Sequence, residues 1–126
     1  MTNETNITAA VRIVRLTRHG ADAAQVAELQ RIFGEVEVET KSVSLPSTPK
    51  EAVAEFDILV ADATVVEAVL PVNLLEAVLK FSAFAKRGGK VIRSAMVRET
   101  KPDGEVVFTF SYYEEVKKIE VVVERL

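Results

Sequence analysis

The chain has no cysteine and no tryptophan, and it contains a single histidine, His19. The absence of cysteine excludes a disulfide scaffold, a thiol nucleophile and any cysteine-ligated zinc or iron–sulfur centre. One histidine excludes a site that needs two. No apolar run approaches the ~18 residues of a membrane helix, and the first ten residues lack a secretion signal. We therefore expect a cytoplasmic protein without a membrane segment, folded as one domain over residues 1–126.

Charge is unevenly distributed along this chain, whose formal net charge is −3. Residues 35–67 carry eight acids and two lysines, a local net of −6, whereas residues 77–98 carry six bases and no acid, a local net of +6. Long nucleic acid is bound by neutralising many phosphates, so an acidic protein is a poor partner for it. The basic segment indicates either solvated charge near the end of a helix or a localised site for a small phosphorylated ligand. A second basic cluster precedes His19 and consists of Arg12, Arg15 and Arg18.

Apolar periodicity and turn residues predict alternating strands and helices in the first half of the chain. Residues 11–17 are rich in Val, Ile and Leu, which indicates a strand. Asp22 is placed to cap a helix that ends at Phe33. Residues 35–45 alternate charged and apolar side chains, which predicts a half-exposed strand. Pro49 suits the first turn of a second helix.

The third strand has two possible positions. Residues 56–61 are apolar enough for a buried parallel strand. Alternatively, the second helix continues to about Asp62 and residues 65–70 form the strand. Glu67 opposes the second position, because a charge in a central strand is costly. Spacing to the motif at residues 70–74 favours it, and we adopt 65–70 as the prediction.

The second half of the chain predicts one long helix followed by strands. The helix covers residues 72–87 and ends at Gly88-Gly89, and a hairpin turn is expected at Lys101-Pro102-Asp103-Gly104. The expected strands are residues 90–97, 105–110 and 117–124. The predicted fold class is therefore α/β: a Rossmann-like, mostly parallel sheet flanked by helices and extended by C-terminal antiparallel strands.

This architecture predicts where a ligand binds. In open α/β sheets, ligands lie outside the carboxyl ends of the strands, where the strand order reverses. Three segments are expected to meet at that rim: Arg18-His19-Gly20, residues 70–73 with Asn73, and Arg98-Glu99. Helix N-termini behind the first two would add backbone N–H donors for an anion.

The sequence motifs of nucleotide cofactors are missing. No Gly-x-Gly-x-x-Gly follows the first strand, and there is no Walker lysine loop, so we predict no dinucleotide, ATP or other cofactor. Asp57, Asp62 and Glu67 lie close in sequence, but no ligand of another type accompanies them. We therefore predict no metal site.

Two short motifs resemble known families. Arg18-His19-Gly20 after a strand is similar to the start of the histidine phosphatase superfamily, but that family needs a second histidine, which this chain lacks. The wider pair of motifs resembles a group of small CRISPR-associated Rossmann-like (CARF-like) proteins, ring nucleases that act on cyclic oligoadenylate messengers. This pair is Thr17–Ala21 after the first strand and Leu70–Leu74 at the start of a later helix. The first motif of that group usually carries a proline at or beside the position of Gly20.

The second resemblance implies a homodimer that binds a cyclic oligoadenylate and, as a ring nuclease, cleaves it without a metal. In such a reaction a ribose 2′-hydroxyl attacks the adjacent phosphate. The implied catalytic residues are Arg18, which would stabilise phosphate charge, and His19, which would move a proton. Gly20, Asn73 and Arg98 are the implied ligand-binding residues.

A function of a different class is compatible with the same residues. The chain would then be a non-enzymatic dimeric interaction or accessory protein of viral or mobile-element origin. In that case the charged rim is incidental, and exposed apolar surface near Tyr112 is the functional part. A well-formed pocket at the strand ends favours the first hypothesis, and a flat rim with a large apolar patch elsewhere favours the second.

Overall fold

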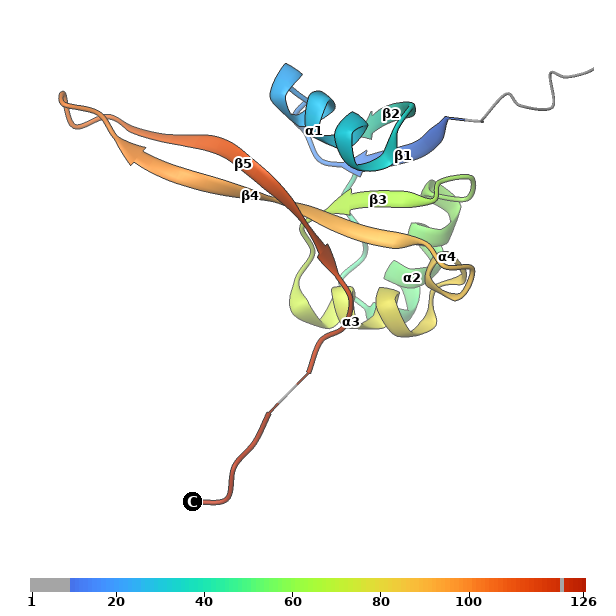
Figure 1. Cartoon of the computed structure of the whole chain (residues 1–126). Helices are drawn as coiled ribbons and strands as arrows, with labels where there is room; N and C mark the ends of the chain where they lie inside the picture. The colour runs from blue at the N-terminus through green and yellow to red at the C-terminus, as the bar shows by residue number, and fades with distance from the viewer. Residues whose placement is uncertain (1–9, 121) are drawn as a thin grey trace, which may run out of the picture.

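A computed structural model describes residues 10–120 and 122–126 of the chain. Five strands form one sheet in the order β2-β1-β3-β4-β5, in which all neighbours are parallel except β4 and β5 (Figure 1). The elements in chain order are β1 (Val11–Leu16), α1 (Ala23–Phe33), β2 (Val36–Lys41), α2 (Pro49–Leu59), β3 (Val65–Ala68), α3 (Val72–Phe81), α4 (Ala83–Lys86), β4 (Lys90–Thr100) and β5 (Val106–Val116). The Rossmann-like prediction is confirmed, including the antiparallel extension at the C-terminal side.

Helices cover the two faces of the sheet unequally. α1 lies alone on one face, and α2, α3 and α4 form the layer on the other (Figure 1). Alternate residues of the central strands point to the two layers, as the period of two requires. Val66 belongs to the large core on the three-helix side, whereas Ile13 and Val65 belong to a smaller core with Leu29 of α1. The α1 face therefore has less apolar cover.

The first two strands and the first helix form as predicted, with a shorter second strand. The Asp22 carboxylate accepts a hydrogen bond from Gln25 N (2.8 Å), and the Gln25 side chain accepts one from Asp22 N (3.1 Å). This reciprocal capping box begins α1. β2 ends at Lys41, so residues 42–45 of the predicted strand lie in the loop before α2 instead.

β3 takes the position adopted from the motif spacing. Phe56 is fully buried within α2, and β3 begins only at Val65. Glu67 does lie in the central strand and is 6% exposed. Its charge is tolerated there because Arg15 of the neighbouring β1 pairs with it. The argument from Glu67 against this strand was wrong because the sequence does not reveal that partner.

The long helix predicted over residues 72–87 is interrupted. α3 ends at Phe81, and Ser82 is the N-cap of the short α4. Ser82 Oγ donates to Val78 O (2.6 Å) and accepts from Ala85 N (2.9 Å), which ends one helix and starts the next. Gly89 then leads into β4. A Cβ atom added at Gly89 would lie 2.5 Å from the Phe84 ring.

The C-terminal strands differ most from the prediction. β4 and β5 are each 11 residues long and join at the predicted turn, where Gly104 N donates to Lys101 O (2.9 Å). β5 continues through a bulge opposite Ala95 and Met96 and ends at Val116. The strand predicted over residues 117–124 is wrong for residues 117–120 and 122–124, which are in no strand; residue 121 lies outside the described residues.

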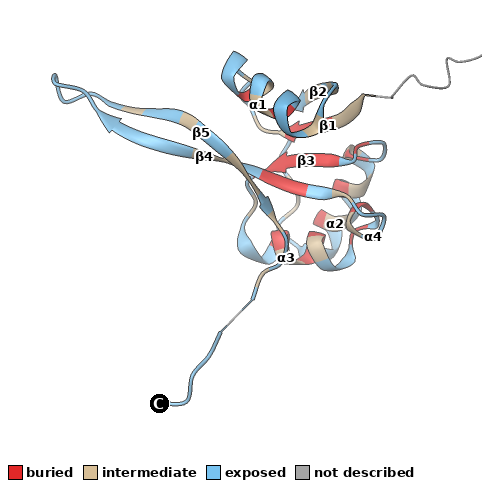
Figure 2. Cartoon of the chain, viewed as in Figure 1, coloured by how far each residue is buried: buried red, intermediate tan, exposed pale blue. Residues whose placement is uncertain are grey.

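Buried residues concentrate in β3 and the first part of β4, whereas the distal part of the β4–β5 hairpin is exposed (Figure 2). Residues 94–112, which we call the arm, extend away from the helices as a two-stranded ribbon (Figure 1). Over residues 10–120 and 122–126, no helix is long and apolar enough to cross a membrane.

Candidate functional site

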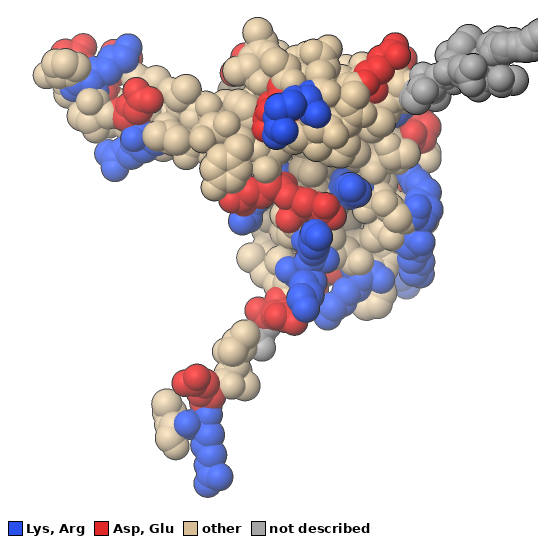
Figure 3. All heavy atoms as spheres, viewed as in Figure 1, with Lys and Arg blue, Asp and Glu red and all other residues tan. Residues whose placement is uncertain are grey.

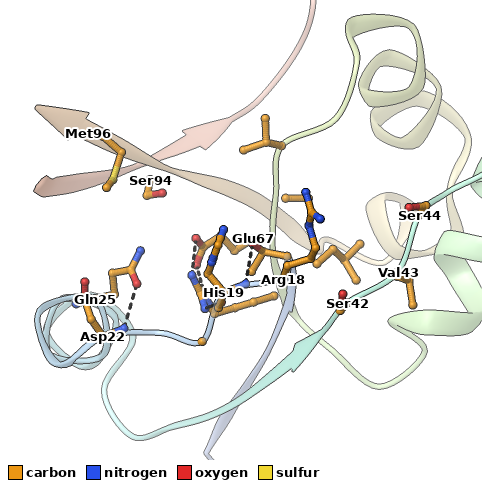
Figure 4. A pocket seen from close by; sticks show the side chains of 16 residues that line it. Arg18, His19, Asp22, Gln25, Ser42, Val43, Ser44, Glu67, Ser94 and Met96 are labelled. Carbon is orange, nitrogen blue, oxygen red and sulfur yellow. Dashed lines mark hydrogen bonds and ion pairs between the residues drawn. The ribbon is translucent and has the colours of Figure 1, made fainter. Parts of the chain in front are cut away.

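A cavity of about 810 Å³ lies where the strand order reverses, at the carboxyl ends of β1 and β3. This is the position at which doubly wound sheets bind their ligands. Its lining comes from the loop after β1, the loop after β2, the end of β3 and the middle of β4 (Figure 4). The lining residues are Arg15, Leu16, Thr17, Arg18, His19, Gly20, Asp22, Gln25, Ser42, Val43, Ser44, Glu67, Ala68, Val69, Ser94 and Met96.

A buried ion pair forms the floor of the cavity. Arg15 is 3% exposed and Glu67 is 6% exposed. Arg15 Nε donates to Glu67 Oε1 (2.8 Å) and Nη2 donates to Oε2 (3.2 Å), a bidentate arrangement. Burial lowers the pKa of Arg15, but the hydrogen bond and the charge of Glu67 outweigh it, so that this pKa is raised. The pair therefore brings no net charge to the cavity.

The same ion pair connects two other segments. Arg15 Nη1 donates to the backbone oxygen of His19 (2.7 Å), which fixes the loop after β1. On the other side, Tyr113 Oη of β5 donates to Glu67 Oε1 (2.8 Å). Burial, followed by this hydrogen bond and the charge of Glu67, raises the pKa of the Tyr113 phenol, so it remains a donor. The base of the arm and the His19 loop are thus joined through Arg15 and Glu67.

Arg18 and His19 occupy the rim above this floor. Both are exposed, and within residues 10–120 and 122–126 no ion pair or hydrogen bond engages either side chain. His19 is held through its backbone, because its N–H donates to Thr17 Oγ1 (3.3 Å) and its carbonyl accepts from Arg15. Among the described residues other than its two chain neighbours, none has an atom within 4 Å of the position that a Cβ of Gly20 would take, so the loop is open there. The rim therefore offers a cation and an imidazole to a ligand.

Three other basic residues of the sequence clusters, Arg12, Arg87 and Arg93, make contacts that hold the fold together. Arg12 pairs with Glu39 and Asp62, and Arg93 pairs with Glu114. Arg87 donates to two backbone carbonyls of the loop before β3 and stacks on the Phe84 ring (5.3 Å to its centroid). Figure 3 shows Lys and Arg side chains spread over the α3–α4 side of the body and along the arm. The basic segment 77–98 thus does not form one anion site.

Two predicted site residues lie outside the cavity lining. Asn73 is exposed at the start of α3, and the lining stops at Val69, before that helix. Arg98 is exposed within β4, which continues to Thr100 and carries this residue out along the arm. The expectation that strand 90–97 ends near the rim was wrong because pairing with β5 prolongs it. Arg18, His19 and Gly20 are the predicted residues that the cavity brings together.

Several lining residues were missed by sequence reasoning. Ser42 and Ser44 lie within three residues of the end of β2, so the strand-end rule would have identified them had the strand been predicted to end at Lys41. Gln25 is buried and its oxygen caps α1, while Figure 4 shows its amide nitrogen pointing toward the cavity. Ser94 reaches the cavity from the middle of a strand, a position that no local signal marks.

The N-terminus of α1, which was expected to donate N–H groups to a bound anion, already donates one to a side chain of the protein. The Gln25 N–H at the start of α1 bonds to the Asp22 carboxylate, so the helix terminus carries its own anion. A phosphate in the cavity would therefore depend on Arg18 and the serine hydroxyls rather than on α1. Within the described residues, no group of three or more His, Asp or Glu side chains is arranged to hold a metal ion.

Comparison with known proteins adds no assignment. No protein family, no curated protein and no solved structure matches this chain.

Proposed function

We propose that the cavity at the ends of β1 and β3 binds a small phosphorylated ligand, and that this ligand is a cyclic oligoadenylate. The main observation behind the proposal is that the Arg18 guanidinium is not neutralised by an acid of the described residues. Within the described residues Arg18 is the one arginine of the 12–18 cluster without an ion pair, and it stands at the rim of a cavity at the switch point. An exposed guanidinium at such a place matches phosphate in charge and in geometry.

The remaining lining supports an anionic, polar ligand. The cavity volume of about 810 Å³ is within the ~300–1,000 Å³ range of small-molecule sites. Ser42 and Ser44 provide hydroxyl groups from the loop after β2, and Ser94 provides one from β4 on the opposite side (Figure 4). Glu67 does not repel a phosphate because Arg15 neutralises it.

Cleavage is the second step of the proposal. The ribose 2′-oxygen attacks the adjacent phosphorus in line, forming an O2′–P bond as the P–O5′ bond breaks. His19 accepts the 2′-hydroxyl proton, and a proton returned to the leaving 5′-oxygen completes a 5′-hydroxyl and a 2′,3′-cyclic phosphate. Arg18 stabilises the charge that develops on the phosphate oxygens.

The proposal includes a homodimer. A cyclic oligoadenylate with an even number of nucleotides is a ring of phosphates with approximate two-fold symmetry, and two copies of one cavity about a two-fold axis would match it.

Titration calorimetry with cyclic tri-, tetra- and hexa-adenylate in EDTA tests binding, and chromatographic detection of the linear product after incubation with the same rings tests cleavage. We expect one ring to bind the unmodified protein and Arg18→Ala to weaken its affinity by ~10- to 100-fold, because charged hydrogen bonds to phosphate are lost. His19→Ala should bind nearly normally but cleave ~10²- to 10⁴-fold more slowly. Arg31→Ala is the matched control, since this exposed arginine pairs with Glu28 on α1 and does not line the cavity.

The outcomes separate the two steps. If none of the three rings binds, the ligand assignment is wrong. If a ring binds through Arg18 but no product forms, the protein is a binding module and the catalytic role of His19 is wrong.

A further inference from the structure

The arm extends one face of the cavity beyond the body of the protein. β3 pairs with β4 only as far as Ile92, so the arm (residues 94–112) forms a two-stranded ribbon. Ser94 and Met96 line the cavity. Because side chains alternate along a strand, residue 98 continues the face of residues 94 and 96.

The strand register identifies the partners on this face. Met96 stands opposite Phe110, and Arg98 stands opposite Phe108. Directly paired residues of an antiparallel ribbon share a face. We call this surface the cavity face of the arm; its residues are Ser94, Met96, Arg98, Thr100, Val106, Phe108 and Phe110.

The cavity face combines exposed aromatic and cationic groups. Phe108 is 62% exposed and Met96 is 47% exposed. At the end of the cavity face nearest the body of the protein, Phe110 packs against Tyr113, with ring centroids 4.9 Å apart. A surface phenylalanine beside an arginine is the arrangement on which bases of single-stranded nucleic acid stack.

From this continuity we propose that the cavity face of the arm binds the bases of an oligonucleotide whose phosphates lie at Arg18 and His19. The inference rests on the proposed function. A ligand that contacts Arg18 at one end and extends over Met96 to Phe108 needs a negative charge at the first end and flat apolar groups at the second. Adenine rings on a phosphate backbone have that chemistry, and Arg98 complements the next phosphate along.

The opposite face of the arm provides matched controls. Tyr112 is 50% exposed and stands opposite Ala95, so it points away from the cavity face. Val97 is 46% exposed, neighbours Met96 and is also on the opposite face. These residues resemble Phe108 and Met96 in exposure and in strand position.

The test measures affinity for two probes, cyclic tetra-adenylate and inorganic pyrophosphate. We expect Phe108→Ala to weaken cyclic tetra-adenylate binding by about 10-fold and to leave pyrophosphate binding unchanged, since only the first probe has bases to stack. Phe108→Tyr should restore the affinity, which shows that an aromatic ring is required. Tyr112→Ala should bind both probes normally, and Arg18→Ala should weaken both.

Each alternative result has a distinct meaning. If Arg18→Ala weakens both probes but Phe108→Ala weakens neither, the arm proposal is overturned and the proposed function stands. If neither variant changes the affinity for either probe, the proposed function fails. If Phe108→Ala converts a dimer to a monomer in sedimentation without changing ligand affinity, a second copy covers this face and the arm proposal is overturned.

Discussion

Arg15 and Glu67 are a buried ion pair in the two central strands of the sheet. Such a pair costs solvation free energy that apolar residues of the same size would not. A further hydrogen bond of Arg15 holds the carbonyl of His19 and therefore the loop that forms the rim, so the pair also positions the site. The residues that shape the site are thus partly those beneath it.

Removing one member of this pair should destabilise the protein more than removing both. Arg15→Met leaves the Glu67 carboxylate buried without its main partner, and we expect a loss of about 3–5 kcal/mol in the free energy of unfolding. Arg15→Met combined with Glu67→Leu should recover most of this loss. Urea unfolding followed by circular dichroism measures both values; an Arg15→Met protein as stable as the unmodified one would contradict the assignment.

Tyr113 gives the protein a dependence on alkaline pH. Burial and the Glu67 hydrogen bond raise the pKa of this phenol in the folded state, whereas an unfolded tyrosine titrates near ~10. The unfolded state therefore loses its proton first, so the contribution of Tyr113 to stability is complete below pH ~10 and decreases as the pH rises above that value. Urea unfolding between pH 8 and 11 should show this decrease in the unmodified protein and a smaller one in Tyr113→Phe.

At the scale of elements, the break between α3 and α4 shows how a distant residue can override a local pattern. The apolar stripe of residues 72–87 is that of one helix. Asp57 of α2 nevertheless accepts hydrogen bonds from Ala83 N (3.0 Å) and Phe84 N (3.2 Å), the first N–H groups of α4. With Ser82, this carboxylate supplies the start of a new helix. The partner is 26 residues away in sequence, so periodicity could not predict it.

Asp57→Ala should therefore loosen α4 specifically. The loss of a helix-capping acceptor costs about 1 kcal/mol, and amide hydrogen exchange should accelerate at residues 83–86 while β1 and β3 keep their protection. Glu55→Ala, an exposed acid on the same helix, serves as the control. Equal acceleration in both variants would show that Asp57 does not hold α4.

The extra length of β4 and β5 also results from contacts between residues far apart in sequence, as does the break between α3 and α4. The predicted strand 90–97 ends where its apolar content falls, but pairing with β5 carries β4 to Thr100. A bulge in β5 then lets Tyr113 point to Glu67 while Phe110 remains on the same face. Local composition locates a hairpin turn well and strand length poorly, because length depends on the partner strand.

At the scale of the whole molecule, the cavity exists because the two faces of the sheet are covered unequally. Three helices pack on one face and α1 packs on the other, so the carboxyl ends of β1 and β3 stay uncovered on the α1 side (Figure 1). Arg18, His19 and Gly20 were predictable as site residues because they follow a strand directly. Ser94 and Glu67 were not, because they enter the site from within strands whose register is set by long-range pairing.

The sequence alone determined the alternation of strands and helices, the cap of α1, the hairpin turn and the loop that carries Arg18 and His19, because each depends on neighbouring residues. Tertiary structure alone decided that Arg15 would be neutralised, that Arg18 would have no ion-pair partner among the described residues and that Arg98 would lie on the arm. Those outcomes depend on which side chains meet across strands and loops up to 52 residues apart, and the energy of a buried charge depends on its partner.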